Sequence, residues 1–458
     1  MIFPFFSNLM YNITSHITAR LCYTTLVASL ILMFATPVRA QEDENNEKLN
    51  QFTIDAELLT RGEIRQGGLP ESEEDNDNKA QFILERTRLG LDFERTFLKA
   101  HITGQHSAVW GQAGKGSFNL YEAWAQLTSR KGFFAKIGRQ VLSYDDERII
   151  GSNDWAMAAL SHDMLKLGFE NDQHKLHLMF AYNQNSESVN GGSVYRDGDK
   201  PYKTMANVWY HYQHHRVPFG ASLLFMNIGM QSELDAYINK SHYQQLIGTY
   251  LSYKPNNWSA EGSFYYQFGR NEYDMNISAW MASVKGTYSP SNQWMLTAGY
   301  DILSGDEFFA VPPGGNIGLG LIQHKSIKGF SPVYGSHHKF YGAMDFFYLS
   351  TYYHGFTPGL QNYYAGVCYK PISKVSLDAA YHYLAIATNT DNLDKPLGHE
   401  LELSASYTPI KEVSVSLGYS YMHGSKTMEA LKRVDNKKNL HWAWLNVIVR
   451  PRFLQIKW

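Results

Sequence analysis

The chain has 458 residues, a length that suits either two or three soluble domains or one large barrel. Aromatic residues make up 14% of it and tyrosine alone contributes 31, yet the mean hydropathy is −0.36. Many aromatic residues without overall apolarity are unusual for a soluble enzyme and fit a wall with one face in lipid and one in water. Since 41 Lys and Arg stand against 43 Asp and Glu, the net charge of −2 indicates no nucleic-acid partner.

The first 40 residues have the layout of a signal peptide. Arg20 precedes the apolar run LCYTTLVASLILMFAT, the segment PVRA ends at Ala40, and the acidic QEDENNE follows. This order predicts cleavage near Ala40. The alternative is that the run is retained as a membrane anchor, although it is short for a bilayer span. We expect residues 1–40 to be removed, 41–51 to be a flexible segment and 52–458 to fold.

The two cysteines, Cys22 and Cys368, fall on either side of the predicted cleavage site. Removal of Cys22 leaves Cys368 alone, which excludes an intramolecular disulfide and a zinc site built on thiolates. We expect Cys368 to act as a small apolar residue in a strand. The sequence predicts no cofactor and no bound metal.

From residue 52 onward the dominant pattern is an alternation of apolar and polar residues with a period of two. In KLHLMFAYNQ at 175–184, for example, Leu176, Leu178 and Phe180 fall on one face of a strand, and the residues between them fall on the opposite face. The segments FLKAHITGQ, VSLDAAYHYLAI and ELELSASY repeat the pattern. No later stretch reaches the roughly 18 apolar residues of a transmembrane helix. A membrane location therefore requires a barrel of strands.

Eighteen segments carry the strand pattern, an even number as expected for a single-chain bacterial barrel. They lie at 52–65, 80–93, 97–109, 117–128, 133–143, 162–171, 174–184, 204–214, 217–227, 242–253, 258–269, 276–288, 293–304, 361–370, 373–387, 399–408, 412–422 and 440–450. The sequence therefore predicts an all-β fold, namely a transmembrane antiparallel β-barrel of eighteen strands.

The predicted connections alternate between short turns and long polar loops. Short turns lie at 94–96, 171–173, 254–257, 289–292, 370–373 and 408–411, and several contain proline, which cannot extend a strand ladder. Longer loops lie at 66–79, 110–116, 144–161, 185–203, 228–241, 270–275, 305–360, 388–398 and 423–439. Short periplasmic turns and long extracellular loops are typical of a barrel in the outer membrane of a Gram-negative bacterium.

The connection 305–360 is the longest and is rich in Gly, Pro and His. We expect it to fold into the lumen as a constriction or to cap one end of the barrel. It contains a candidate extra strand at 338–347, so one more hairpin is the alternative. The chain ends in HWAWLNVIVRPRFLQIKW, whose alternation and terminal Trp458 resemble the signal that outer-membrane assembly machinery recognises. We therefore expect that machinery and outer-membrane lipid as partners.

Cationic residues gather on the expected aqueous face of the early strands. Arg86 and Arg88 are two residues apart and so point to one side, opposite Leu89 and Leu91. Further cations in this region are Arg61, Arg65, Lys136, Arg139, Lys166 and Lys175. Rings of Arg or Lys that line a pore select anions. The alternative is that each arginine is paired with a glutamate such as Glu57, Glu63 or Glu122 and only holds the wall.

Three blocks resemble the alginate-export family of outer-membrane channels: YEAWAQL at 121–127, FFAKIGRQVLSYDDERIIGSNDW at 133–155 and SHDMLKLGFE at 161–170. Together with ERTRLGLDF upstream, the resemblance covers residues 80–170 and continues beyond them only as barrel periodicity. It implies an eighteen-stranded barrel with a charged, constricted lumen. The lumen or constriction residues that it implies are Arg86, Arg88, Arg139, Arg148 and Asp163.

One position departs from the family pattern. Members often carry a basic residue shortly before the aspartate that matches Asp163, and here Leu160 takes that place. The resemblance to the family's best-known members implies an anionic uronate polysaccharide as the solute. One cation fewer weakens that expectation but leaves the expectation of a channel unchanged.

Other residue groups give weaker hypotheses. His211, His214 and His215 suggest a metal site, but the last two lie at a predicted turn. Asp197 and Asp199 lie in a loop that calcium could bind, and a solvated acidic turn is the preferred interpretation. The segment KTMEALKRV at 426–434 has helical spacing. Ser161 and His162 cannot form a nucleophile–base pair, because neighbours in a strand face opposite sides.

We therefore expect a channel, not an enzyme, that passes an anionic polysaccharide, an oligosaccharide or a small anionic solute through a monomeric barrel. The expected lumen residues are Arg61, Arg86, Arg88, Lys136, Arg139, Arg148, Asp163 and Lys166. The alternatives are a general or substrate-specific diffusion porin without a polyuronate role, and a surface adhesin or receptor that acts through 305–360. A barrel enzyme is the least favoured.

Overall fold

The computed structural model describes residues 50–66, 79–112, 115–187, 189–190, 193–198, 200–234, 239–306, 326–347, 357–389, 393–432 and 439–458. The predicted signal peptide, the predicted flexible segment up to residue 49, Asp199 and parts of the 305–360 connection lie outside these ranges.

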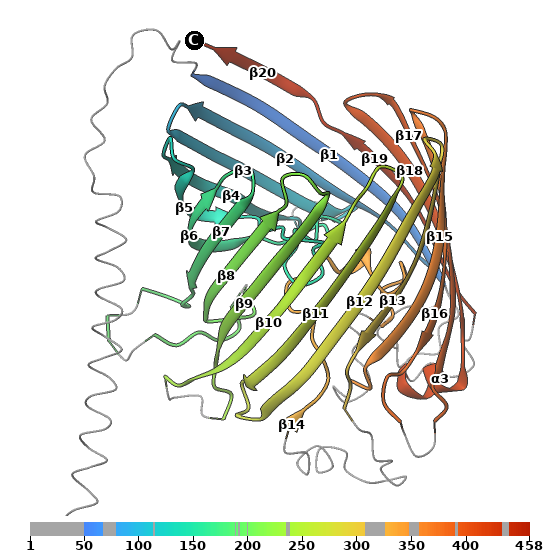
Figure 1. Cartoon of the computed structure of the whole chain (residues 1–458). Helices are drawn as coiled ribbons and strands as arrows, with labels where there is room; N and C mark the ends of the chain where they lie inside the picture. The colour runs from blue at the N-terminus through green and yellow to red at the C-terminus, as the bar shows by residue number, and fades with distance from the viewer. Residues whose placement is uncertain are drawn as a thin grey trace, which may run out of the picture. The chain divides into compact units, whose positions relative to one another are not determined.

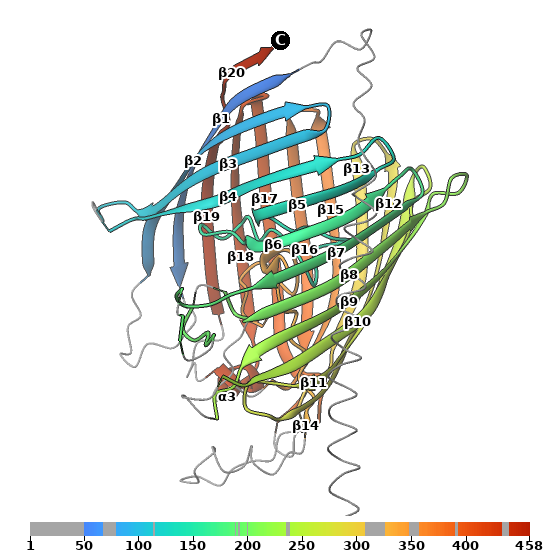
Figure 2. The same ribbon diagram turned by 90° about the vertical axis from the view of Figure 1, so that its left-hand side faces the viewer.

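Twenty strands form one sheet, shown in Figures 1 and 2. They are β1 Gln51–Gln66, β2 Ala80–Arg95, β3 Leu98–Val109, β4 Ser117–Thr128, β5 Phe133–Gln140, β6 His162–Glu170, β7 His174–Tyr182, β8 Thr204–Gln213, β9 Phe219–Gln231, β10 Ser241–Tyr253, β11 Trp258–Arg270, β12 Asn276–Ser291, β13 Trp294–Leu303, β14 Ser326–Ile327, β15 Leu360–Ile372, β16 Val375–Ala385, β17 Pro396–Ile410, β18 Val413–Gly424, β19 Asn439–Val449 and β20 Arg452–Lys457.

The sheet closes into a barrel of eighteen strands. Neighbouring wall strands pair antiparallel, and β1 pairs with β2 on one side and with both β19 and β20 on the other. β19 and β20 are two parts of one wall strand, separated at Pro451, which has no backbone N–H to donate. β14 only adds two residues parallel to β12. Twenty strands less β14, with β19 and β20 joined, give the predicted eighteen.

The connections confirm the alternation of short turns and long loops. Between wall strands, the gaps at 96–97, 292–293, 373–374 and 411–412 are two residues long, whereas 141–161, 183–203 and 304–359 are the longest. The prediction of a candidate strand at 338–347 is wrong. Residues His337–Lys339 form a short 3-10 helix, and Tyr341 and Gly342 have positive φ angles of 66° and 94°, which an extended strand does not accept.

The alternation of side chains separates an outward from an inward face. On β7, Leu176 and Tyr182 are 38% and 52% exposed, whereas Met179 is fully buried. The buried apolar cluster, which includes Met179, Met226 and Trp442, lies on the inward face. Part of the lumen is therefore packed rather than open.

Two segments occupy this inner space and are visible inside the barrel in Figures 1 and 2. We name residues 141–161 the inward loop and residues 326–347 the inner segment. They contact each other, and Ile150 and Tyr334 form a parallel β-bridge between them. The predicted helix near 426–434 is present as α3, Lys426–Lys432, whose Met428 joins the inner cluster. No helix within the described ranges is long and apolar enough to span a membrane.

Candidate anion path in the lumen

Arg61, Arg86 and Arg88 point into the barrel. On β2, Leu89 is 50% exposed on the outside, and the two arginines occupy the alternate positions. Arg86 is fully buried and Arg61 on β1 is 4% exposed. Such burial of a guanidinium requires ion pairs and hydrogen bonds, since an isolated buried charge is very costly.

Arg86 is paired on the wall and bonded to the inward loop. Its guanidinium donates to Glu57 Oε1 at 2.7 and 3.0 Å. It also donates to the backbone carbonyls of Asp154 and Ala156 at 2.9 and 3.2 Å. Glu57 is the partner foreseen in the alternative that arginines hold the wall. Arg86 therefore fixes the inward loop to the barrel.

Arg61 is likewise paired with a carboxylate on the wall and hydrogen-bonded to the inward loop. Its Nε donates to Glu63 Oε1 at 2.8 Å, and its Nη1 donates to the Trp155 carbonyl at 3.0 Å. The guanidinium lies 4.0 Å from the centre of the Trp155 ring, and His338 stacks on that ring at 4.0 Å. Arg61, Trp155 and His338 thus connect the wall, the inward loop and the inner segment.

Arg88 completes this group on β2. It donates to Gln105 Oε1 at 2.7 Å and to Asp154 Oδ1 at 2.8 Å, and its guanidinium lies 3.9 Å from the centre of the Tyr121 ring. Its charge is therefore compensated by Asp154 of the inward loop.

Arg148 lies within the inward loop and crosses the lumen to the far wall. Its guanidinium pairs with Asp301 on β13 at 3.1 Å and with Asp146 at 3.2 Å, and donates to the Tyr341 hydroxyl at 2.9 Å. Burial acts to lower the pKa of Arg148, but Asp301, Tyr341 and Asp146 hold that pKa well above its usual value. Arg148 is a fixed cation of the constriction.

Lys136 and Lys166 form a different kind of site. They face each other on β5 and β6, and their strand positions point inward, like those of Phe134 and Met164. The Lys136 amine lies 3.5 Å from the centre of the Trp124 ring. Among the described residues, neither lysine forms a hydrogen bond or an ion pair. Two adjacent cations without a carboxylate partner attract an anion from the lumen.

Arg139 and Asp163 point outward, which corrects the lumen position that the sequence suggested. The register of β5 and β6 runs without interruption from Phe133 to Gln140, so Arg139 shares the face of Ile137, which is 62% exposed. The two residues form a bidentate pair at 2.8 Å for both hydrogen bonds. Arg139 also donates to the Leu120 carbonyl at 3.1 Å. This pair lies on the outward face of the wall and not in the lumen.

Leu160, which takes the place of a family cation, packs against the inner apolar cluster. The contact of Trp124 with Lys136 was not predictable from the sequence, because it depends on the register between β4 and β5. Glu400 and Glu402 on β17 carry no sequence signal either; their carboxylates accept the backbone N–H groups of Met344 and Ala343 at 2.8 and 2.7 Å. These two glutamates anchor the inner segment.

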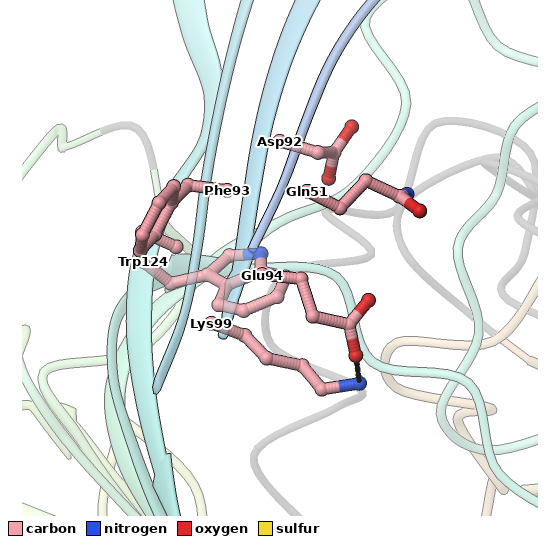
Figure 3. A pocket seen from close by; sticks show the side chains of 7 residues that line it. Gln51, Asp92, Phe93, Glu94, Lys99 and Trp124 are labelled. Atoms are coloured by element: carbon pink, nitrogen blue, oxygen red, sulfur yellow. Dashed lines mark ion pairs between the residues drawn. The ribbon is translucent and has the colours of Figure 1, made fainter. Parts of the chain in front are cut away.

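Figure 3 shows a small pocket on the inner wall near the short turns. Its volume is about 60 Å³, well below the roughly 300 Å³ of pockets that hold small molecules. Its lysine, Lys99, is paired with Glu94 at 2.5 Å, and the nearby Asp92 bonds to His101 at 2.6 Å. This pocket therefore adds no free cation to the anion path.

Two of the histidines suggested as metal ligands have other hydrogen-bond partners. His211 bonds to the Ser222 hydroxyl at 2.9 Å, and His214 Nδ1 accepts the backbone N–H groups of Arg216 and Val217 in a turn. Across the described part of the chain, no group of three His, Cys, Asp or Glu side chains is arranged to hold a metal.

Comparison with known proteins agrees with this architecture. The model of the family described as Alginate export matches residues 93–399. The fold is similar to that of Pseudomonas aeruginosa OccK9 (OpdG), with 12% identity, 88% of this chain and 98% of that chain covered, and a TM-score of 0.60. It is also similar to the Pseudomonas aeruginosa outer membrane protein opdK, with 10% identity, coverage of 90% and 99%, and a TM-score of 0.59.

A third similar structure is a BenF-like porin from Pseudomonas fluorescens Pf-5, with 11% identity, coverage of 88% and 99%, and a TM-score of 0.57. At these identities the likeness concerns the fold alone. A search of curated proteins returns no match. The predicted fold class and the predicted family are confirmed.

Proposed function

Because the chain belongs to the alginate-export family and folds as an outer-membrane channel, we propose that it conducts anionic solutes past Lys136 and Lys166. The solute class is an anionic polysaccharide, an oligosaccharide or a smaller anion. The lumen must bind this solute weakly enough to release it again. The single observation that carries the proposal is the inward-facing lysine pair without a carboxylate partner.

The arginines have a different part in this proposal. Arg61, Arg86 and Arg148 are each compensated by an acidic side chain and bonded to the inward loop or to the inner segment. Their contribution is to hold the constriction at a fixed width. The two lysines supply positive charge that no ion pair neutralises and that Glu122 and Glu170 offset only from a distance. A diffusion porin without a polyuronate role stays the alternative, since Leu160 reduces the positive charge near the constriction.

The proposal retains the other expected partners. The barrel acts as a monomer in outer-membrane lipid, and its last strand with Trp458 serves assembly machinery. The adhesin hypothesis depends on the long connection between β13 and β15, of which 307–325 and 348–356 lie outside the described residues.

Planar-bilayer recording of the purified protein tests the solute class. We expect ion current with a reversal potential that shows anion preference, and loss of most of that preference in Lys136→Gln/Lys166→Gln. Lys285→Gln is the matched control, because Lys285 is an inward lysine that is paired with Glu261 at 2.7 Å. Cation preference in the unchanged protein, or equal effects of the double variant and the control, would overturn the proposal.

A further inference from the structure

Tyrosine and histidine side chains form a continuous row across the wall strands β13 and β15–β19, which lie side by side in Figure 1. Strand register places each member directly opposite the next. The row runs Tyr300, Tyr363, Tyr383, His399, His423 and Asn439. Neighbours in such a row are about 5 Å apart. A second row, two residues nearer the short turns, contains Tyr381, Leu401, Tyr421 and His441.

Both rows face outward at the end of the strands next to the long loops. Tyr363 and Tyr381 are each 45% exposed. Towards the short turns the same face becomes apolar, with Leu403, Leu417 and Leu445 at 46%, 54% and 49% exposure. The rows therefore mark the height at which an apolar, lipid-facing zone gives way to polar side chains, which in a barrel is the outer interface of the membrane.

Three histidines distinguish this surface from an ordinary aromatic girdle, and we name His399, His423 and His441 the histidine row. Nδ1 of His399 is hydrogen-bonded to the Tyr381 hydroxyl at 2.5 Å, and Nδ1 of His441 to the Tyr419 hydroxyl at 2.8 Å. Nδ1 of His423 donates to Asn439 Oδ1 at 2.9 Å. Within the described residues, Nε2 of each ring has no partner and stays available outside the wall.

Charge on this face favours an anionic ligand. The outward strand positions of β16–β19 hold no Asp, Glu, Lys or Arg. The imidazole N–H groups of this face therefore have no acidic side chain at a neighbouring outward position to bind. His399 and His423 stand directly opposite each other, so their rings present donors side by side. By contrast, the outward His106 already lies 3.6 Å from Glu85.

We propose that the histidine row binds the phosphorylated headgroup of a lipid in the outer leaflet. The Nε2–H groups of His399 and His441 donate to phosphate oxygens, while the hydroxyls of Tyr381 and Tyr419 hold these two rings in position. Asn439 holds the ring of His423 beside them. The acyl chains of the same lipid lie along the leucines below. A lipid fits better than free phosphate, because donors and apolar surface are continuous on one face.

Native mass spectrometry of the purified full chain tests this proposal by measuring lipid binding. The two ligands compared are lipid A with two phosphates and the same lipid A after both phosphates have been removed. We expect the phosphorylated form to bind about tenfold more tightly, the order of magnitude of one charge-assisted hydrogen bond. The ratio of the two affinities should fall to about one in the triple variant His399→Gln/His423→Gln/His441→Gln. Binding of the phosphate-free lipid should stay unchanged, which shows that the variant is folded.

His174→Gln is the matched control. His174 is also outward and bonds to a tyrosine hydroxyl, that of Tyr210 at 2.7 Å, but it lies at the short-turn end of β7. We expect this variant to keep the tenfold ratio. Equal binding of both lipids by the unchanged protein, or a preserved ratio in the triple variant, would overturn the proposal. Displacement of the phosphorylated lipid by an equimolar amount of inorganic phosphate would overturn the choice of a lipid.

Discussion

Ile150 and Tyr334 pair as a parallel β-bridge inside the barrel, although they come from two loops on different sides of the wall. The bridge is made by hydrogen bonds from the Gly151 N–H to the Tyr334 carbonyl at 2.9 Å and from the Tyr334 N–H to the Ile149 carbonyl at 3.1 Å. The inward loop and the inner segment are therefore one body. Arg61 and Arg86 hold it on one wall, and Glu400 and Glu402 hold it on the other.

Replacement of Arg86 by methionine should loosen this body and destabilise the wall. Glu57 would lose its buried partner and keep Arg450, at 2.8 Å, and the more distant Arg88, at 3.7 Å. Loss of one member of a buried ion pair costs about 3 kcal/mol. We expect a fall of that order in the free energy of unfolding, measured with urea in lipid vesicles, together with a larger single-channel conductance. Arg86→Met/Glu57→Leu should recover part of the stability but not the original conductance.

The other anchor can be tested separately. Glu400→Leu/Glu402→Leu removes the acceptors for the backbone N–H groups of Met344 and Ala343. We expect a larger or more variable single-channel conductance, because the inner segment loses its attachment to β17. Asp378→Leu removes an inward carboxylate of β16 that accepts the Ser376 hydroxyl at 2.8 Å near the short turns, and it should leave the conductance distribution unchanged. Identical conductance in all three proteins would contradict the role of the two glutamates.

Asp145 in the inward loop makes the attachment depend on pH. Burial raises the pKa of Asp145 to about 6 from its usual value near 3.8, against the lowering effect of hydrogen bonds from Ser222 and Trp209. A carboxyl with a raised pKa contributes stability that is complete below about pH 4 and is lost as the pH rises through 6. A shift of two units corresponds to about 3 kcal/mol at most.

The measurement is the melting temperature at pH 4.5 and pH 7.5 in the unchanged protein and in Asp145→Asn. The variant should lose the part of the pH dependence that Asp145 provides, so the decrease towards pH 7.5 should be smaller than in the unchanged protein. Equal decreases in both proteins would mean that Asp145 does not carry this titration.

The outward pair of Arg139 and Asp163 gives a fourth prediction. Arg139→Leu leaves a carboxylate unpaired on the lipid-facing surface, which we expect to lower the free energy of unfolding by about 2 kcal/mol. Arg139→Leu/Asp163→Leu should recover that loss, since apolar side chains suit lipid. Ion selectivity should be unchanged in both variants. A loss of anion preference in the double variant would place this pair in the solute path after all.

The strands were predictable because lipid on one side and water on the other impose a period of two on every wall segment. The same period would also have assigned Arg139 correctly, since Ile137 and Phe133 stand on its face of β5. The family resemblance, which grouped Arg139 with the lumen residues, outweighed that pattern. The continuation of the last strand beyond Pro451 was missed because a proline in the sequence normally ends a ladder.

The partners of the lumen cations were not predictable from single strands. Glu57, Glu63 and Glu122 were all candidate partners of the arginines, and only the register of β1 against β2 assigns Glu57 to Arg86. The contacts of Arg86 with the inward loop depend on how residues 141–161 fold back, and no periodic pattern encodes that path. Local alternation therefore reveals which face a charge occupies, while its partner follows from tertiary structure.

The seam at β1 also determines the order in which the molecule can be assembled. Gln51 pairs with Lys457, so the first wall strand finds its second neighbour only after nearly the whole chain has been synthesised. Arg61, on that same strand, donates to the Trp155 carbonyl of the inward loop. The strand at which the wall closes is therefore also one that holds the loop inside it. The barrel closes around its constriction, and a chain that lacked β20 would leave Gln51–Ile54 as an open edge for pairing with other chains.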